Sequence, residues 1–224
     1  MLNIRVFFHK TGRAKYISHL DTMRCMQRAL VRAGLPVWYT EGFNPHIYLT
    51  FPLPLSLGYE SESETMDFRL VEDDYSLEEV TARLNRSLPP DIRVIRTAEP
   101  VNKPELIEQA IWSIKLTAKN ADDKALAETF TRFMQQEEIL VEKRAKKGQR
   151  KIMKQIDIRP MCELLSCEAD GEYAVLTLKA AAGIHTNLNP TLLTDAFAAK
   201  EQIEGLHSWI CRKQLLLADG SDFI

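Results

Sequence analysis

The order of short apolar patterns in the first hundred residues constrains the fold more than any other feature of this sequence. Leu2–Lys10 is rich in β-forming residues and predicts a strand. Two helical patterns follow, and each begins with a serine and an acid three residues later, Ser18 with Asp21 and Ser76 with Glu79. The remaining segments are rich in β-branched and aromatic residues. The resulting order is strand, helix, strand, strand, helix, strand.

The second half of the chain restarts this pattern. A linker at 101–108 precedes a strand pattern, a helical pattern, a hairpin with a basic tip, a further strand, a helix opening at Asn189-Pro190 and a last strand. We therefore predict an α+β fold of two tandem ferredoxin-like (βαββαβ) halves with antiparallel sheets, covering residues 1–100 and 109–224.

The composition excludes several classes of protein. In 224 residues, 45% of them apolar, no uncharged apolar run reaches the roughly 18 residues that a membrane span needs, and the charges in the first apolar segment lead us to expect no secretory signal. We therefore expect a cytoplasmic protein. The four cysteines lack the spacing of a zinc site or an iron–sulfur cluster, so the sequence predicts free thiols, no metal and no cofactor.

The charges are strongly segregated, although the formal net charge is only −2. Residues 1–34 hold seven Lys and Arg against one acid, and residues 143–159 hold eight against one. Residues 60–79 hold nine acids against one arginine. Because a polyanion responds to the local field, a nearly neutral chain of this kind can still present a basic face.

Three arginines in the first helix, Arg24, Arg28 and Arg32, lie at i, i+4 and i+8 and predict one exposed stripe. The opposite face is predicted to be buried, with Leu20, Met23, Leu30 and Ala33. Like charges at this spacing repel one another, and arginine suits bidentate contact with phosphate. The stripe favours RNA as a partner, and the alternative is an ordinary solvated helix face.

Two further groups of cations are candidate phosphate contacts. The turn at Gly12 lies ahead of a helix N-terminus, where backbone N–H groups and the helix dipole attract anions. Its cations are Lys10, Arg13 and Lys15. The predicted hairpin supplies a second patch of Lys146, Lys147, Arg150 and Lys151. The alternative for both groups is a solvated, solubilising surface.

Two polar loops could contact bases. The first contains Glu41, Phe43, Asn44 and His46, and the second contains His185 and Asn187. Turn chemistry and core packing are the alternative explanations for both. His9, His19 and His46 would form a metal site or a general acid and base only if the fold brought them together, and no metal site is predicted.

The segment from Lys10 to Glu62 resembles the bacterial radical-SAM-linked protein family through "KTGRAKYISHLD", "GFNPH" and "LPLSLGYESE". "VEKRAKKGQRKIMKQIDIRP" and "NLNP" extend the resemblance over nearly the whole chain. The chain departs from the family pattern at Asn189, where an arginine is expected. The resemblance implies a partner, because members are encoded beside, or fused to, cobalamin-binding radical-SAM proteins, often near an RNase E/G-type gene.

These observations lead to one main hypothesis and two alternatives. The main hypothesis is an RNA-binding accessory protein that presents a structured RNA, tRNA or rRNA, to a partner radical-SAM enzyme. The first alternative is a metal-independent RNA-processing or RNA-modifying enzyme of duplicated ferredoxin-like fold, with His19 or His46 as acid and base and Arg13 stabilising developing phosphorane charge. The second alternative is a protein–protein adaptor for the radical-SAM partner.

Overall fold

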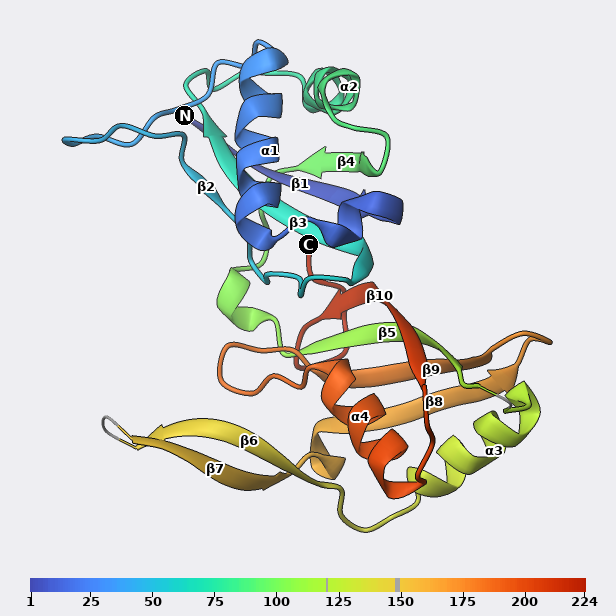
Figure 1. Ribbon diagram of the computed structural model, residues 1–224. Helices are drawn as coiled ribbons and strands as arrows, with labels where there is room; N and C mark the ends of the chain where they lie inside the picture. The colour runs from blue at the N-terminus through green and yellow to red at the C-terminus, as the bar shows by residue number, and fades with distance from the viewer. Residues whose placement is uncertain (120, 148–149) are drawn as a thin grey trace. The chain divides into compact units, whose positions relative to one another are not determined.

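The computed structural model describes residues 1–119, 121–147 and 150–224, with only the backbone of 143–147 and 150–152. These residues form a mixed α+β protein with four α-helices and mostly antiparallel strands. They divide into two compact units (Figure 1). Unit 1 comprises Met1–Ile107 and Cys211–Ile224, and unit 2 comprises Glu108–Ile210. The predicted division placed residues 109–224 together, whereas here 211–224 group with unit 1.

Unit 1 is built on a sheet in which β1 (Leu2–Lys10) is central, between β4 (Ile92–Ala98) and β3 (Glu60–Leu70). Both pairings are antiparallel. The short β2 (Leu49–Thr50) pairs with β3 near Phe68, and β10 (His207–Leu216) pairs in parallel with the opposite end of β3, where Cys211 faces Glu60. Apart from a 3-10 turn at Gly12–Tyr16, the strands and α-helices from β1 to β4 follow the predicted order.

Helices α1 (His19–Arg32) and α2 (Leu77–Ser87) pack against one face of this sheet (Figure 1). The shared core includes Val6 and Phe8 of β1, Met26 and Leu30 of α1, and Leu84 of α2. Burial of these apolar side chains supplies the main driving force for folding of the unit. The second face of the sheet carries the alternate residues of each strand, which are mostly polar.

Helix α1 begins where the sequence predicts, because the Ser18 hydroxyl accepts a hydrogen bond from the Asp21 N–H at 3.1 Å. The prediction that Leu20 lies on the buried face is wrong, since Leu20 is 58% exposed. Thr22 occupies the buried position in this turn instead. At about 100° per residue, Leu20 and Thr22 point to different sides of the helix.

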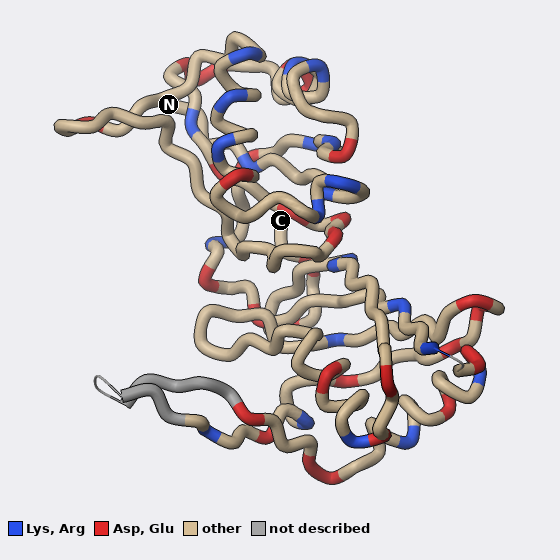
Figure 2. Tube along the Cα trace, in the orientation of Figure 1, with Lys and Arg blue, Asp and Glu red and all other residues tan. Residues whose placement is uncertain are grey.

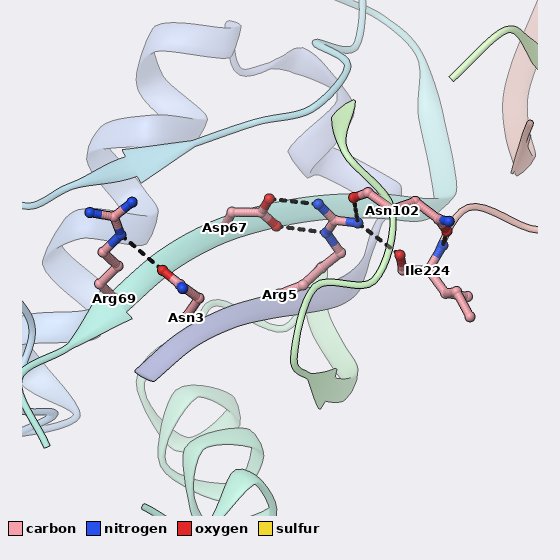
Figure 3. A network of polar contacts seen from close by, with 6 residues as sticks. All are labelled: Asn3, Arg5, Asp67, Arg69, Asn102 and Ile224. Carbon is pink, nitrogen blue, oxygen red and sulfur yellow. Dashed lines mark hydrogen bonds and ion pairs between the residues drawn. The ribbon is translucent and has the colours of Figure 1, made fainter. Parts of the chain in front are cut away.

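A buried arginine on the second face ties the last residues of the chain into unit 1 (Figure 3). Arg5 donates to both carboxylate oxygens of Asp67 at 2.7 Å. Its remaining nitrogen donates to the backbone carbonyls of Asn102 at 2.9 Å and Ile224 at 3.0 Å. The Phe223 ring lies 4.2 Å from the guanidinium carbon. This bidentate, fully partnered arrangement is the geometry in which a buried cation is tolerated.

Unit 2 contains the neighbouring strands β5 (Gln109–Thr117), β9 (Ala174–Ala181) and β8 (Cys162–Ala169), together with α3 (Asp123–Phe133) and α4 (Pro190–Lys200). The first residues of β10 also belong to it. The predicted hairpin is observed as β6 (Leu140–Lys147) and β7 (Arg150–Asp157), which form a separate two-stranded sheet. Strand β8 is not predicted by the sequence, because most of its side chains are partly or fully exposed and it lacks an apolar alternation.

Candidate nucleic-acid interface on unit 1

The arginine stripe of α1 is exposed as the helical spacing predicts, and Figure 2 shows its basic positions along the helix. Arg24 forms an ion pair with Asp21 at 3.1 Å, and Arg32 donates to the Ser87 carbonyl at 2.7 Å. Within the described part of the chain, Arg28 has neither a hydrogen bond nor an ion pair. The stripe therefore combines two oriented guanidinium groups with one that is available for a ligand.

Residues 38–48 form a narrow ribbon that projects from the sheet (Figure 1). Tyr39 bridges Ile47, and the Thr40 N–H donates to the His46 carbonyl at 2.8 Å. Phe43 at the turn is fully exposed, at 105% of its reference area, and Glu41 and Asn44 are exposed beside it. This large aromatic side chain therefore contributes no buried surface to the core.

The base of the ribbon is fixed by stacking. The Arg69 guanidinium carbon lies 4.3 Å from the centre of the Tyr48 ring and 5.4 Å from that of Trp38. These two rings meet edge to face with their centres 5.9 Å apart. Cation–π and aromatic contacts of this kind hold the ribbon where it leaves the sheet.

A pocket of about 430 Å³ lies where α1 faces the ribbon. It is lined by Gln27, Arg28, Val31, Arg32, His46 and Ile47. The fold thus brings Arg28 and Arg32 together with His46, which the sequence analysis treated as separate features. The missed members are Gln27, Val31 and Ile47. The i, i+4 pair Gln27–Val31, which runs beside Arg28–Arg32 on the same helix, was a signal for the first two, whereas Ile47 comes from another segment.

The imidazole of His46 is oriented by its neighbours on the ribbon. Its Nδ1 lies 3.1 Å from the Asn44 carbonyl oxygen and 3.0 Å from the Thr40 hydroxyl. Because a carbonyl oxygen can only accept, the Asn44 contact favours the tautomer protonated at Nδ1. The Nε2 atom is then an acceptor.

The Gly12 turn already holds an anion, and it belongs to the protein. The Asp91 carboxylate accepts from the Arg13 N–H at 3.1 Å, and the Asp91 carbonyl accepts from the Thr11 N–H at 2.9 Å. Gly12 has φ +53°, and a Cβ there would lie 3.0 Å from an Asp91 oxygen. The attraction of this turn for an anion is therefore met by Asp91, and the exposed Arg13 side chain remains at the surface.

Lys10 lies in the interior, where it is 2% exposed. Its ammonium group donates to the Ile17 carbonyl at 3.4 Å, and burial lowers the pKa of Lys10 while nearby Glu64 raises it. Glu64 is paired with the equally buried Arg212, which also donates to the Leu53 carbonyl at 3.0 Å. Lys15 is half-buried and pairs with Glu60 at 3.3 Å. Lys10 and Lys15 are therefore held within unit 1, apart from the exposed stripe.

The candidates of the second half lie on unit 2. Lys146, Lys147, Arg150 and Lys151 lie on β6 and β7, and their side chains fall outside the described residues. His185 and Asn187 are exposed in a loop closed by a bridge from Asn187 to Ala182. Asn189 caps α4 by accepting from the Thr191 N–H at 3.0 Å, which accounts for the asparagine in this place.

The three histidines of the first half have different surroundings. The His19 ring meets Phe51 edge to face with centres 5.1 Å apart, whereas His46 lines the α1 pocket, to which neither His19 nor Arg13 contributes. His9 lines a different pocket together with Phe7 and Thr65. Within the described ranges, no three His, Cys, Asp or Glu side chains are placed to hold a metal ion.

The cysteines are free thiols, as predicted. Burial raises the pKa of Cys162 and of Cys211 to about 11, and it also raises the pKa of Cys167. These thiols are therefore protonated near neutral pH and are poor nucleophiles. No helix in the described residues is long and apolar enough to cross a membrane.

Unit 1 is thus an α+β unit whose exposed face joins an arginine-bearing helix to an aromatic ribbon. The chain belongs to the family described as "Uncharacterized protein conserved in bacteria (DUF2344)", whose model matches residues 3–190. No curated protein matches the chain. Among solved structures, a chain of a heavy metal efflux pump is similar at 9% identity with a TM-score of 0.23. That similarity covers 94% of the present chain and 28% of the pump chain.

Proposed function

We propose that this protein binds RNA through unit 1 and acts as an accessory protein for an RNA-modifying enzyme. The observation that carries the proposal is the exposed α1 stripe, Arg24, Arg28 and Arg32, of which Arg28 and Arg32 share a pocket with the ribbon whose Phe43 is fully exposed. Arginine forks contact phosphate, and exposed aromatic rings stack on bases. A nucleic acid carries both phosphates and bases, so it is a ligand that could contact the arginine stripe and the exposed phenylalanine together.

The partner follows from the resemblance to the radical-SAM-linked family. On this proposal the radical chemistry belongs to the partner, and the present chain presents a structured RNA such as tRNA or rRNA. We also interpret the chain as two tandem ferredoxin-like halves. The order β5, α3, β8, β9, α4, β10 repeats that of the first six elements once the β6–β7 hairpin is regarded as an insertion.

The test is binding of total tRNA across a salt series, with heparin as a charge-matched polyanion. The variant Arg24→Glu/Arg28→Glu/Arg32→Glu is expected to lose most of its tRNA affinity. The slope of the logarithm of the binding constant against the logarithm of the salt concentration should become less steep by about 2, because each phosphate contact contributes about 0.7 to 0.9 to that slope. The control Lys103→Glu/Lys119→Glu/Lys124→Glu reverses three exposed lysines elsewhere and should retain binding. Equal binding by wild type and the arginine variant, or equal affinity for heparin, would refute the proposal.

A groove in unit 2 favours the adaptor function as a second candidate. It has a volume of about 690 Å³ between the end of α3, residues 136–142 and α4. Its lining combines apolar side chains with three acids and one lysine, namely Phe133, Ile139, Val141 and Leu192 with Glu138, Glu142, Asp195 and Lys200. This chemistry fits an apolar, basic segment of a protein partner.

The adaptor function is tested by coexpression with the radical-SAM partner and pull-down with and without nuclease. Ala199→Trp, which fills the groove from an exposed position, should abolish a direct contact. If nuclease treatment by itself prevents capture of the partner, the association between the two proteins is mediated by RNA.

A further inference from the structure

We propose that the pocket between α1 and the ribbon holds one unpaired nucleotide, so that unit 1 recognises single-stranded rather than double-stranded RNA. This inference rests on the proposed function, and it deepens that function by assigning a ligand to the six residues that line the pocket. On this proposal, the pocket is the site that distinguishes single-stranded from double-stranded RNA.

The lining combines two kinds of chemistry. Arg28 and Arg32 lie one helical turn apart, about 6 Å along the axis of α1, and both line the pocket, although one nitrogen of Arg32 already donates to the Ser87 carbonyl. Two apolar side chains complete the lining, the exposed Val31 of α1 and the buried Ile47 of the ribbon. A phosphate alone would use the arginines and leave the apolar surface unused. A purely apolar ligand would leave the cations without a counter-charge.

A nucleotide satisfies both parts of this lining. Its base has flat apolar faces that can rest on Val31 and Ile47, and its phosphate can be held by Arg28, which has no protein partner within the described residues. The volume of about 430 Å³ lies within the range of small-ligand pockets. A pocket of this size suits one nucleotide.

The polar groups at the pocket require a base whose edge is free. The Gln27 amide has no hydrogen-bond partner in the described part of the chain, so both its donor and its acceptor groups are available. His46 adds the second ring nitrogen opposite its Asn44 contact. In a duplex the Watson–Crick edges are occupied and the major groove is too deep for side chains, whereas unpaired bases expose both edges and faces.

Phe43 extends the site along the ribbon. It lies three residues before His46 and is fully exposed, so it can stack on the base next to the bound nucleotide. A chain of phosphates running beside Arg24, Arg28 and Arg32 would place successive nucleotides on this side of α1. The arrangement is that of a single-strand site, with a basic track and separate platforms for bases.

The test compares a 12-nucleotide single-stranded RNA carrying 2-aminopurine with the duplex formed by the same strand and its complement. Wild type is expected to bind the single strand at least about fivefold more tightly, with a change in 2-aminopurine fluorescence on binding. Val31→Trp fills the pocket and Val31→Ala removes its apolar contact without adding bulk. Both should lower single-strand affinity about fivefold and leave duplex affinity unchanged.

The matched control is Val71→Trp, because Val71 and Val31 are both 57% exposed. Val71 does not line the pocket, so this variant should behave as wild type. Unchanged thermal unfolding of all three variants will confirm that affinity reports on the site. Equal affinity of wild type for both RNAs, or full single-strand affinity in both Val31 variants, would overturn the pocket assignment while the RNA-binding function stands. If wild type binds neither RNA, the proposed function itself fails.

Discussion

Unit 1 holds arginines in two opposite settings. Arg5 and Arg212 are each 1% exposed and each is paired with a carboxylate, and Arg5 also donates to two backbone carbonyls and Arg212 to that of Leu53. Arg24, Arg28 and Arg32 lie on the surface of α1, and Arg28 has no protein partner in the described residues. The comparison teaches that the basic character of a segment does not identify a ligand surface. The cations that stabilise the fold are separated from those available for a partner by burial and pairing.

The largest effect is expected from Arg5→Ala. It leaves the mostly buried Asp67 carboxylate and two backbone carbonyls without their donor, and removing one partner of a buried pair costs about 3 to 5 kcal/mol. Urea unfolding measures the loss. A decrease in the free energy of unfolding of less than about 1 kcal/mol would show that Arg5 contributes no more to stability than a surface cation.

Glu64→Gln should have the next largest effect. The substitution retains the size of the side chain but leaves Arg212 buried without a counter-charge, with Lys10 close by. We expect the free energy of unfolding to fall by about 3 kcal/mol. Glu62→Gln is the matched control, since Glu62 pairs with Lys213 at the surface and such pairs contribute about 1 kcal/mol or less.

Lys10→Met should change stability little at pH 7, from no change to a gain of about 1 kcal/mol, because a buried cation is replaced by an apolar side chain of similar length. The variant and the wild type should differ in how their stability depends on pH. Burial lowers the pKa of Lys10 in the folded state below its ordinary value of 10.5. Between the two pKa values the unfolded chain binds more protons, so wild-type stability rises with pH there.

The variant should lack that rise. Urea midpoints of both proteins, measured from pH 7 to pH 10.5, will check this difference. A wild-type stability that falls relative to Lys10→Met over this range would show that the folded state favours the charged form, and that Glu64 outweighs the burial of Lys10.

The smallest effect on stability is expected from Arg24→Ala/Arg28→Ala/Arg32→Ala. Exposed helix positions tolerate such changes to within about 0.5 kcal/mol each, and the loss of repulsion along the stripe offsets the lost contacts of Arg24 and Arg32. We expect a thermal unfolding temperature close to that of wild type together with weakened tRNA binding. This result would show that the stripe serves binding, whereas Arg5 serves stability. A loss of several kcal/mol would mean that the stripe is structural.

The sequence predicts local features of unit 1 well. The start of helix α1 is set by the Ser18 cap and its near neighbours, and the exposure of the arginines follows from their spacing of four residues. The turn residues in "EGFNPH" also mark the ribbon. For such features the interacting groups are close in sequence, and pattern is sufficient to find them.

The features that the sequence does not predict depend on distant partners. Arg212 lies 148 residues from Glu64, and Asp91 lies 78 residues from Arg13. The burial of Lys10 and the filling of the Gly12 turn follow from those contacts, so a count of nearby charges could not distinguish Lys10 from Arg28. The α1 pocket was missed for the same reason, because Ile47 reaches it from a different segment.

The return of residues 211–224 to unit 1 has a consequence for the order of events during synthesis. When the ribosome has made the first 107 residues, β3 already carries Glu64 and β1 already carries Arg5, but Arg212 and the Ile224 carbonyl do not yet exist. All of unit 2 is translated before these partners emerge. The α1 face can therefore form early with Arg5 already paired with Asp67, whereas Glu64 lacks its arginine partner until translation reaches the last strand.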